Sequence, residues 1–244
     1  MENRRTMKTD AHIQQSFPNE LLGLIKNLIA LHSVYVISDY FEDNKHVNYL
    51  QPTSNSAQKP VTYTLLIIVH KFPSKSLGDF MDDLYNKTQK RFRVYAIMYT
   101  LSKVRKRLNW GDNFLLKVML QTRCIHKEDD SLHKLCGQSL FFHHSVYELI
   151  QENWKVRMER ADYLLSTIRD IQPKEDFCSM LAVMHFALEQ ICMGLLFVFW
   201  EFKPLHYPLP YLFHLCSHFT ELPQTIFPVD TYGSHRLYYM LCNA

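Results

Sequence analysis

Two pairs of polar side chains at helical spacing are the first candidates for chemistry in this chain. His185 and Glu189 are one turn apart, so they could face one groove and contact a nucleotide or RNA; alternatively, they could bond to each other inside a helical bundle or at a dimer interface. His214 and His218 have the same spacing, which would suit zinc, but Cys216 points to another side of that helix. Because no third ligand stands at a usual spacing, we predict no metal site and interpret this second pair as solvated histidines.

A basic segment is the most distinctive electrostatic feature. Residues 87–123 contain ten Lys and Arg and a single acidic residue, Asp112, which gives +9 in a chain whose total charge is +3. Four of the cations fall in one short predicted helix, with three aromatic residues nearby that could stack on bases: Lys103, Arg105, Lys106 and Arg107, with Tyr95, Tyr99 and Trp110. The segment could bind the phosphates of a nucleic acid. It could equally be a solvated face, or dock against residues 124–244, whose net charge is −5.

The composition narrows the class of protein. Hydrophobic residues make up 47% and charged residues 21% of the 244 positions, which excludes wholesale disorder, and only six glycines argue against a Gly-rich phosphate loop or a Rossmann fingerprint. Six cysteines without a CxxC pair, and an N-terminus without an apolar leader, predict reduced thiols and a cytoplasmic location. The uninterrupted apolar run Ile191–Trp200 is too short to span a bilayer, so we predict no membrane partner.

The elements that would position these groups change in kind along the chain. Residues 1–17 are predicted to be a flexible polar arm. Hydrophobic periodicity and β-branched runs then predict, in chain order, a helix at 19–29 capped by Asn19, a strand at 33–37, a loop at 42–60, a strand at 61–69, a helix at 76–90, a strand at 91–99, and short helices at 102–108 and 113–120. Strands that cluster early, before a helical half, indicate an α+β fold with a small mixed sheet.

The second half has a helical pattern throughout, with helices predicted at 145–171, 177–202, 211–219 and 234–244. The helix at 177–202 repeats apolar residues with alternating spacings of four and three and is apolar on other sides too, which predicts the central helix of a bundle. A charged connection at 127–134 marks the boundary between the halves. We therefore predict an α+β domain at 18–130 and a helical bundle at 140–244, whose last helix could be incomplete at Ala244.

Three stretches of the second half carry a family resemblance: Ala161–Leu165, Leu181–Gln190 and Leu205–Leu212. Together they resemble the HEPN domain, a helical bundle, over about residues 145–244. His185 and Glu189 match the family's His-Gln-Ala-x-Glu-like stretch, whereas Phe186 stands where a glutamine is usual. The resemblance implies a homodimer through the bundle, a nucleotide, nucleic acid or protein partner, and a toxin–antitoxin or defence setting.

The last predicted helix departs from the ribonucleases of that family, which carry an Arg followed after four to six residues by a His. Arg236 stands in a suitable place, but the residues from Leu237 to Ala244 contain no His. A lone Arg cannot supply the acid–base pair that cleavage of a phosphodiester uses. Arg236 is therefore assigned, with His185 and Glu189, to nucleotide or nucleic-acid binding, and a His beyond Ala244 would restore the missing pair.

The first half presents few acidic residues at its predicted strands. The strand at 33–37 is followed by Ser38 and Asp39 without a glycine, the next strand opens with Thr62, Tyr63 and Thr64, and the third has no acid. The arrangement resembles the nucleotidyltransferase fold often fused to HEPN domains, in which a Gly-Ser pair follows the first strand and carboxylates on the next two hold two metal ions. Because hard cations need anionic oxygens, the resemblance implies a degenerate domain with no catalytic residues and no cofactor.

The sequence thus favours a non-catalytic protein with a degenerate nucleotidyltransferase-like half and a HEPN-like bundle. An active enzyme is the alternative. It would be either a nucleotidyltransferase that uses other acids (Asp39, Asp79, Asp82 and Asp83) or a metal-independent ribonuclease that relies on Arg236. A purely structural interaction module is a third reading.

Overall fold

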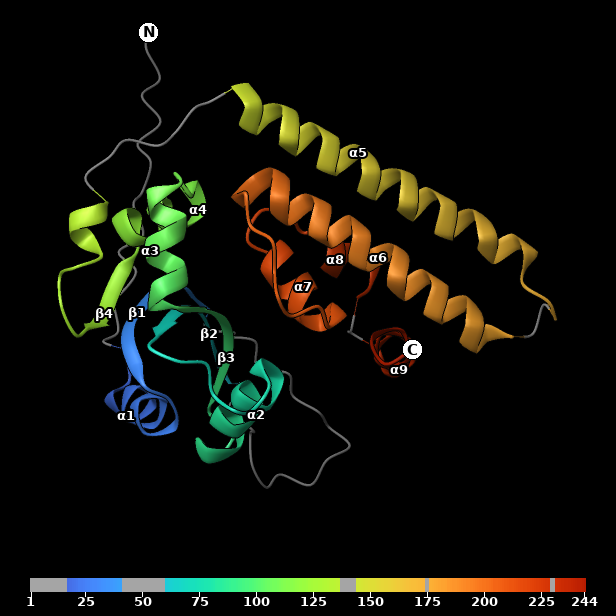
Figure 1. The fold of residues 1–244 in the computed structure, drawn as a ribbon. Coiled ribbons are helices and arrows are strands. Elements are labelled where there is room, and N and C mark those ends of the chain that lie inside the picture. The colour runs from blue at the N-terminus through green and yellow to red at the C-terminus, as the bar shows by residue number, and fades with distance from the viewer. Residues whose placement is uncertain (1–16, 41–59, 137–143, 174–175, 229–230) are drawn as a thin grey trace, which may run out of the picture.

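The computed structural model describes residues 17–40, 60–136, 144–173, 176–228 and 231–244. These residues form a four-stranded sheet with helices on both faces, followed by a helical second half (Figure 1), which confirms the predicted α+β class. The predicted arm lies outside the described residues except for Phe17, which is buried with its ring centroid 5.0 Å from that of Tyr63. The predicted loop at 42–60 also lies outside them, apart from its last residue.

The sheet has the strand order β3-β2-β1-β4. The central strands β1 (Leu31–Tyr40) and β2 (Val61–Val69) are antiparallel, and β2 pairs in parallel with β3 (Phe92–Thr100) after a crossover through α2 (Leu77–Lys87). The short strand β4 (Arg123–Lys127) pairs antiparallel with β1. β2 occupies the predicted range to the residue, and β4 was not predicted.

Alternating side chains place a separate hydrophobic cluster on each face of the sheet. On one face, Val34, Leu65 and Ala96 pack with α1 (Asn19–Leu28) and α2. On the other face, Leu66 and Ile97 belong to a cluster that continues without interruption into the helical half. One hydrophobic core therefore spans both halves of the described chain.

Two helices follow β3 and lie against the second face. Thr100 caps α3 (Leu101–Asn109), and Asp112 caps α4 (Asn113–Gln121) with its carboxylate accepting from the Leu115 backbone amide at 2.8 Å. Gly111 has a φ of 82°, which reverses the chain between them at no steric cost. The predicted Asn19 cap of α1 is wrong, because Pro18 holds the cap position and makes no side-chain bond there.

The helical half begins with a long hairpin. α5 (His144–Thr167) and α6 (Phe177–Trp200) run side by side, joined through the 3-10 turn at Ile168–Asp170, and α6 separates α5 from α7 (Leu209–Cys216) (Figure 1). The short helix α8 (Leu222–Ile226), not predicted, leads to α9 (Tyr232–Cys242), which ends at the cap residue Asn243.

Gly194 is a point of close approach in this hairpin. A Cβ at this residue would lie 3.2 Å from atoms of both Trp154 and Met158. Glycine therefore lets α6 pack closely on α5.

The helix α6 is central, as predicted, but neighbours cover it incompletely. Phe177, Phe186 and Phe199 remain exposed. The prediction from the sequence rested on the uninterrupted apolar run Ile191–Trp200, which is shorter than the helix. By length and composition alone, the 24 residues of α6 are enough to cross a membrane. Only 28% of its most apolar window is buried, and the absence of a membrane partner stays a prediction.

The shared core leads to a stability prediction. Leu212 of α7 is fully buried in the cluster that joins sheet and helices. Replacing Leu212 by Ala should lower the free energy of unfolding by about 2–5 kcal/mol, with sheet and helices still unfolding together in a urea titration followed by far-UV circular dichroism. Leu205→Ala, at an exposed position, should change it by about 0.5 kcal/mol or less. Two separate transitions, with only one of them shifted in Leu212→Ala, would contradict a shared core.

Candidate functional site

The sheet carries a polar cluster where it meets α7. Ser38 of β1 donates to Thr64 Oγ1 of β2 at 3.0 Å, and Thr64 Oγ1 lies 2.8 Å from Nε2 of His214. Nε2 of His218 lies 2.8 Å from Ser38 Oγ and 3.2 Å from Thr64 Oγ1. The imidazoles of His214, on α7, and of His218, just after α7, therefore both contact hydroxyls from the neighbouring strands β1 and β2.

A β-bulge brings the two hydroxyls to one face. In the β1–β2 ladder, Val36 pairs with Leu65 and Ser38 pairs with Thr64, so Ile37 is the extra residue on β1. Residues directly opposite in an antiparallel pair share a face. Ser38 is thus directed with Thr64 toward α7, where the Thr64 side chain has no solvent exposure.

Aromatic packing completes the enclosure. The His214 ring stacks on Tyr95 of β3, with centroids 3.6 Å apart and planes 12° apart, and Trp200 of α6 meets His218 edge to face at 5.2 Å.

Nδ1 of His218 lies 3.1 Å from the carbonyl oxygens of both His214 and Leu215. Since carbonyls only accept, Nδ1 donates, and in the neutral ring Nε2 accepts from a hydroxyl.

These surroundings keep both imidazoles neutral. Burial, with added repulsion from His218 and the Arg93 guanidinium, lowers the pKa of His214 to about 3. Burial also lowers the pKa of His218. The expectation of two solvated histidines is therefore wrong: the rings are packed between the sheet and α6, because α7 lies across the strands rather than at the surface.

The His–hydroxyl cluster is not arranged as a metal centre. Among the residues that the structure describes, no three His, Cys, Asp or Glu side chains are grouped to hold an ion. Thr64 is one of the three β2 residues, with Thr62 and Tyr63, that the sequence placed where the resembled fold has carboxylates, and its hydroxyl bonds to His214 and Ser38. What the cluster does chemically is join sheet and helix through neutral hydrogen bonds.

The lowered pKa values predict how stability depends on pH. A histidine whose pKa is lower in the folded than in the unfolded chain is neutral when folded, so unfolding takes up protons below about pH 6.5. Stability should therefore fall as pH decreases from about 6.5 toward about 3, by at most about 1.4 kcal/mol per pH unit for each such histidine. His214→Gln should flatten this dependence between pH 6 and 4 in urea titrations. His235→Gln, at an exposed position on α9, is the control and should leave it unchanged. An equally steep dependence in wild type and His214→Gln would contradict the burial of a neutral ring.

His185 and Glu189 are brought together, as helical spacing requires. His185 Nε2 lies 3.3 Å from Glu189 Oε1, and its Nδ1 lies 2.8 Å from the Leu241 carbonyl of α9. Both side chains are largely buried, at 12% and 16% exposure. The geometry is that of a pair bonded within the bundle, one of the two readings of the sequence. Arg236 is exposed on α9, and the structure pairs it with neither residue.

The four cations of α3 divide into two kinds. Arg107 is held internally, since its Nε lies 2.5 Å from Asp112 Oδ2 and its NH1 donates to the Tyr99 hydroxyl at 2.8 Å. In contrast, no carboxylate of the described residues lies within ion-pair distance of Lys103, Arg105 or Lys106. Arg105 and Lys106 are exposed, and Lys103 is half-buried. With residues 124–244, Arg105 makes a hydrogen bond from its NH2 to Ser131 Oγ at 3.0 Å.

The three aromatic residues that could stack on bases differ in whether a ring face is accessible. Tyr99 is buried and Tyr95 is stacked on His214, so neither offers a free face to a base. Trp110, directly after α3, is 77% exposed, and the Lys106 ammonium lies 4.6 Å from the centroid of its ring.

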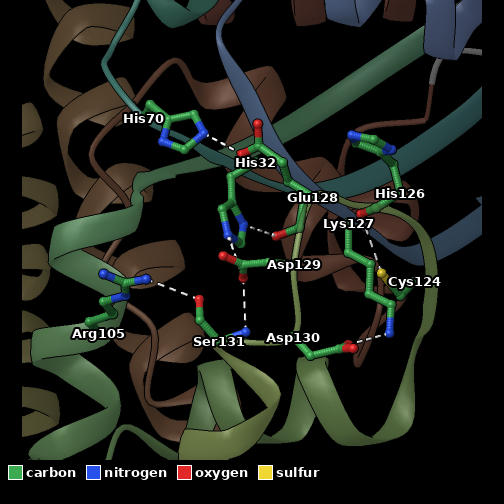
Figure 2. Close-up of polar contacts among 11 residues, drawn as sticks. His32, His70, Arg105, Cys124, His126, Lys127, Glu128, Asp129, Asp130 and Ser131 are labelled. Atoms are coloured by element: carbon green, nitrogen blue, oxygen red, sulfur yellow. Dashed lines mark hydrogen bonds and ion pairs between the residues drawn. The ribbon is translucent and has the colours of Figure 1, made fainter.

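A second polar cluster, at the other end of β1, was not found from the sequence. His32 is 1% exposed, and its Nε2 lies 3.3 Å from Asp129 Oδ1, while His70 pairs with Glu128 at 2.5 Å (Figure 2). Hydrogen bonds from Ser131, with a smaller contribution from His32, lower the pKa of Asp129 to about 2. No sequence signal joins these residues, because His70 follows β2 and Glu128 and Asp129 follow β4, and they meet only where both strands pair with β1.

His32 also contacts a serine, which raises the question of a nucleophilic triad. Its Nδ1 lies 3.2 Å from Ser33 Oγ, on the side of the ring away from Asp129. Ser33 is 1% exposed and adjacent in sequence, so a substrate could not reach its hydroxyl. The cluster therefore anchors the end of β4 rather than forming an accessible site.

The acids of the alternative enzyme reading are dispersed. Asp79 caps α2 by bonding to Ser76, and Asp83 pairs with Lys75 at 2.5 Å. Asp39 lies at the exposed end of β1.

Comparison with known proteins adds little to this geometry. No family model matches the chain, and no curated protein matches its sequence. Among solved structures, it is similar to a nucleotidyltransferase-like protein from Exiguobacterium sibiricum 255-15, at 12% identity and a TM-score of 0.27, over 91% of this chain and 70% of that chain. An overlap of this quality carries no argument about activity, and the α+β class rests on the sheet and helices themselves.

Proposed function

We propose that this chain is a non-catalytic HEPN-family protein with a degenerate nucleotidyltransferase-like half, and that it binds nucleotide or RNA through the cations of α3. A cytoplasmic toxin–antitoxin or defence setting belongs to the same proposal, on the strength of the resemblance alone. The observation that carries the proposal is the exposure of Arg105 and Lys106, without a carboxylate partner among the described residues, beside the exposed Trp110.

Cations without a carboxylate partner are what a phosphate-binding surface requires. A Lys or Arg already engaged by a carboxylate must give up that partner to bind a phosphate. A hydrated one loses only water, while the nucleic acid releases its condensed counterions. Lys103, Arg105 and Lys106 meet this condition among the described residues, and Arg107 does not, because Asp112 holds it. The α3 surface is therefore favoured over the other predicted residues.

The groove expected at His185 and Glu189 supports binding less well. Both side chains have a partner within the bundle, and breaking a largely buried pair to admit a ligand would leave a polar group unsatisfied. We therefore assign this pair a structural role.

Phosphate binding by α3 is tested by removing its free cations. The triple variant Lys103→Ala/Arg105→Ala/Lys106→Ala should weaken RNA binding at low salt at least tenfold, and the slope of log K against log salt should fall by about 0.7 for each phosphate that the variant no longer neutralises. Fluorescence anisotropy with a labelled RNA measures both quantities. The triple variant Lys26→Ala/Lys71→Ala/Arg160→Ala removes equal charge from exposed positions elsewhere in the chain and should retain most of the binding. Equal reductions in the two variants would contradict a localised site.

The enzyme alternative is tested directly by activity. The protein is incubated with labelled ATP, Mg²⁺ and an RNA pool, and we expect neither transfer of label nor cleavage. Either product would overturn the non-catalytic proposal.

We also propose that the partner of the helical hairpin is a second copy of this chain. Of the α5 side chains that the structure describes, Ala161 alone is buried. Leu149, Val156 and Tyr163 are exposed and recur every seven residues, which places them in one line on the side of α5 opposite Ala161. A helix normally hides such an apolar stripe against another helix.

The stripe is one part of the interface that a dimer would need. α5 is about 36 Å long and about 10 Å wide, so its outer side presents roughly 360 Å². A standard interface of about 800 Å² per partner would therefore extend from the stripe onto neighbouring surface. An apolar hollow of about 420 Å³ lies on another side of α5, at its seam with α6, where Tyr147, Trp154 and Phe199 are among the lining residues.

The dimer proposal predicts that a charge in the stripe separates the subunits. Val156→Asp should convert a dimer into a monomer of unchanged helicity, as measured by size-exclusion chromatography with light scattering, because an unpaired carboxylate would be buried at the interface. Leu222→Asp, at an exposed position on α8, should remain dimeric. A monomeric wild-type protein, or a dimer unaffected by Val156→Asp, would contradict the proposal.

A further inference from the structure

Two of the cations of α3 form a line that ends at an aromatic ring. Lys103, Lys106 and Trp110 are separated by three and four residues, so they lie along one side of the helix over about 10 Å. Their neighbours face elsewhere: Arg105 NH2 donates to Ser131 Oγ at 3.0 Å, and Arg107 is held by Asp112. The line is therefore a distinct part of the basic surface.

The indole has one occupied and one open face. The Lys106 ammonium lies over the ring at 4.6 Å from its centroid, a cation–π arrangement that holds the side chain in place. Even so, Trp110 is 77% exposed, and the other side of the ring remains free in the described structure. A large apolar ring kept in water gains free energy when a partner covers it, and a flat ring such as a base can cover the whole face at once.

The charge around the ring selects the partner. Lys103 and Lys106 have no carboxylate partner among the described residues, and Asp112, the single acid of α3 and its two flanking turns, is already bonded to Arg107. The carboxylates near α3 on its Arg105 side are also paired, Glu128 with His70 and Asp130 with Lys127 (Figure 2). A partner that offers negative charge and exposed flat rings together matches this surface.

We propose that Lys103, Lys106 and Trp110 bind single-stranded nucleic acid, with an unpaired base stacked on the open face of Trp110 and flanking phosphates at the two lysines. The inference rests on the proposed nucleic-acid binding of α3 and specifies its substrate class. A single strand presents the faces of its bases, whereas a duplex hides them within the stack. Lysine ammoniums bind phosphates as point charges, and every base offers a flat face for stacking, so little dependence on base sequence follows.

The experiment compares three labelled probes of equal length by fluorescence anisotropy: oligoadenylate, the same backbone without bases, and a blunt duplex. The wild-type protein should bind oligoadenylate most tightly. Trp110→Ala should weaken oligoadenylate binding about tenfold and leave binding of the baseless probe unchanged. Trp110→Phe should recover most of the affinity, because it restores a flat ring. Tyr232→Ala, which removes another highly exposed aromatic side chain on α9, is the matched control and should have no effect.

The outcomes separate this inference from the proposed function. If the α3 cation variant loses binding but Trp110→Ala does not, the phosphate site stands and the stacking inference is overturned. If wild type prefers the duplex, or Trp110→Ala weakens oligoadenylate and the baseless probe equally, a single-strand stacking site is likewise excluded. If the wild-type protein binds none of the probes, the proposed function fails as well, and Trp110 would then be a contact for a protein partner.

Discussion

The seating of α7 on the sheet is the contact on which the rest of the structure depends. The Tyr211 hydroxyl donates to the Ala96 carbonyl on the edge strand β3 at 3.0 Å, and two histidines that follow in the chain, His214 and His218, meet the hydroxyls of the central strands. These bonds lie inside a hydrophobic cluster, where a polar group without a partner is costly. Because both His214 and His218 contact Thr64 and Tyr211 bonds to Ala96, these hydrogen bonds hold α7 and the residues after it at one place on the sheet.

This contact also decides which surfaces remain for function. One face of the sheet lies under α1 and α2 and the other under α3, α4 and α7, and the hydroxyls of Ser38 and Thr64 are bonded to imidazoles there. Two of the features that face solvent are the cationic side of α3 and the apolar side of α5. These are the two surfaces to which the proposed binding of a polyanion and of a second subunit is assigned.

Local pattern predicted the elements well and their mutual placement poorly. The nine residues of β2 are almost all β-branched or apolar, so the strand ends where the pattern ends. Gly111 falls between the two short helices predicted at 102–108 and 113–120. β4 was missed because its five residues mix charged and apolar types without a clear alternation. The His214–Thr64 contact joins residues 150 positions apart, and no periodicity within a helix indicates what lies beneath it. Which of the α3 cations is paired with a carboxylate likewise depends on tertiary neighbours rather than on spacing.

Histidine side-chain ¹⁵N NMR in the presence and absence of Mn²⁺ and ATP tests the central claim most directly, because it observes the rings that close the sheet. A structural role for the cluster predicts that His214 and His218 give neutral-ring signals at pH 7 and that the paramagnetic ion leaves both unbroadened. Selective broadening of these two rings by Mn²⁺ with ATP would place a metal–nucleotide complex at the sheet and contradict that role.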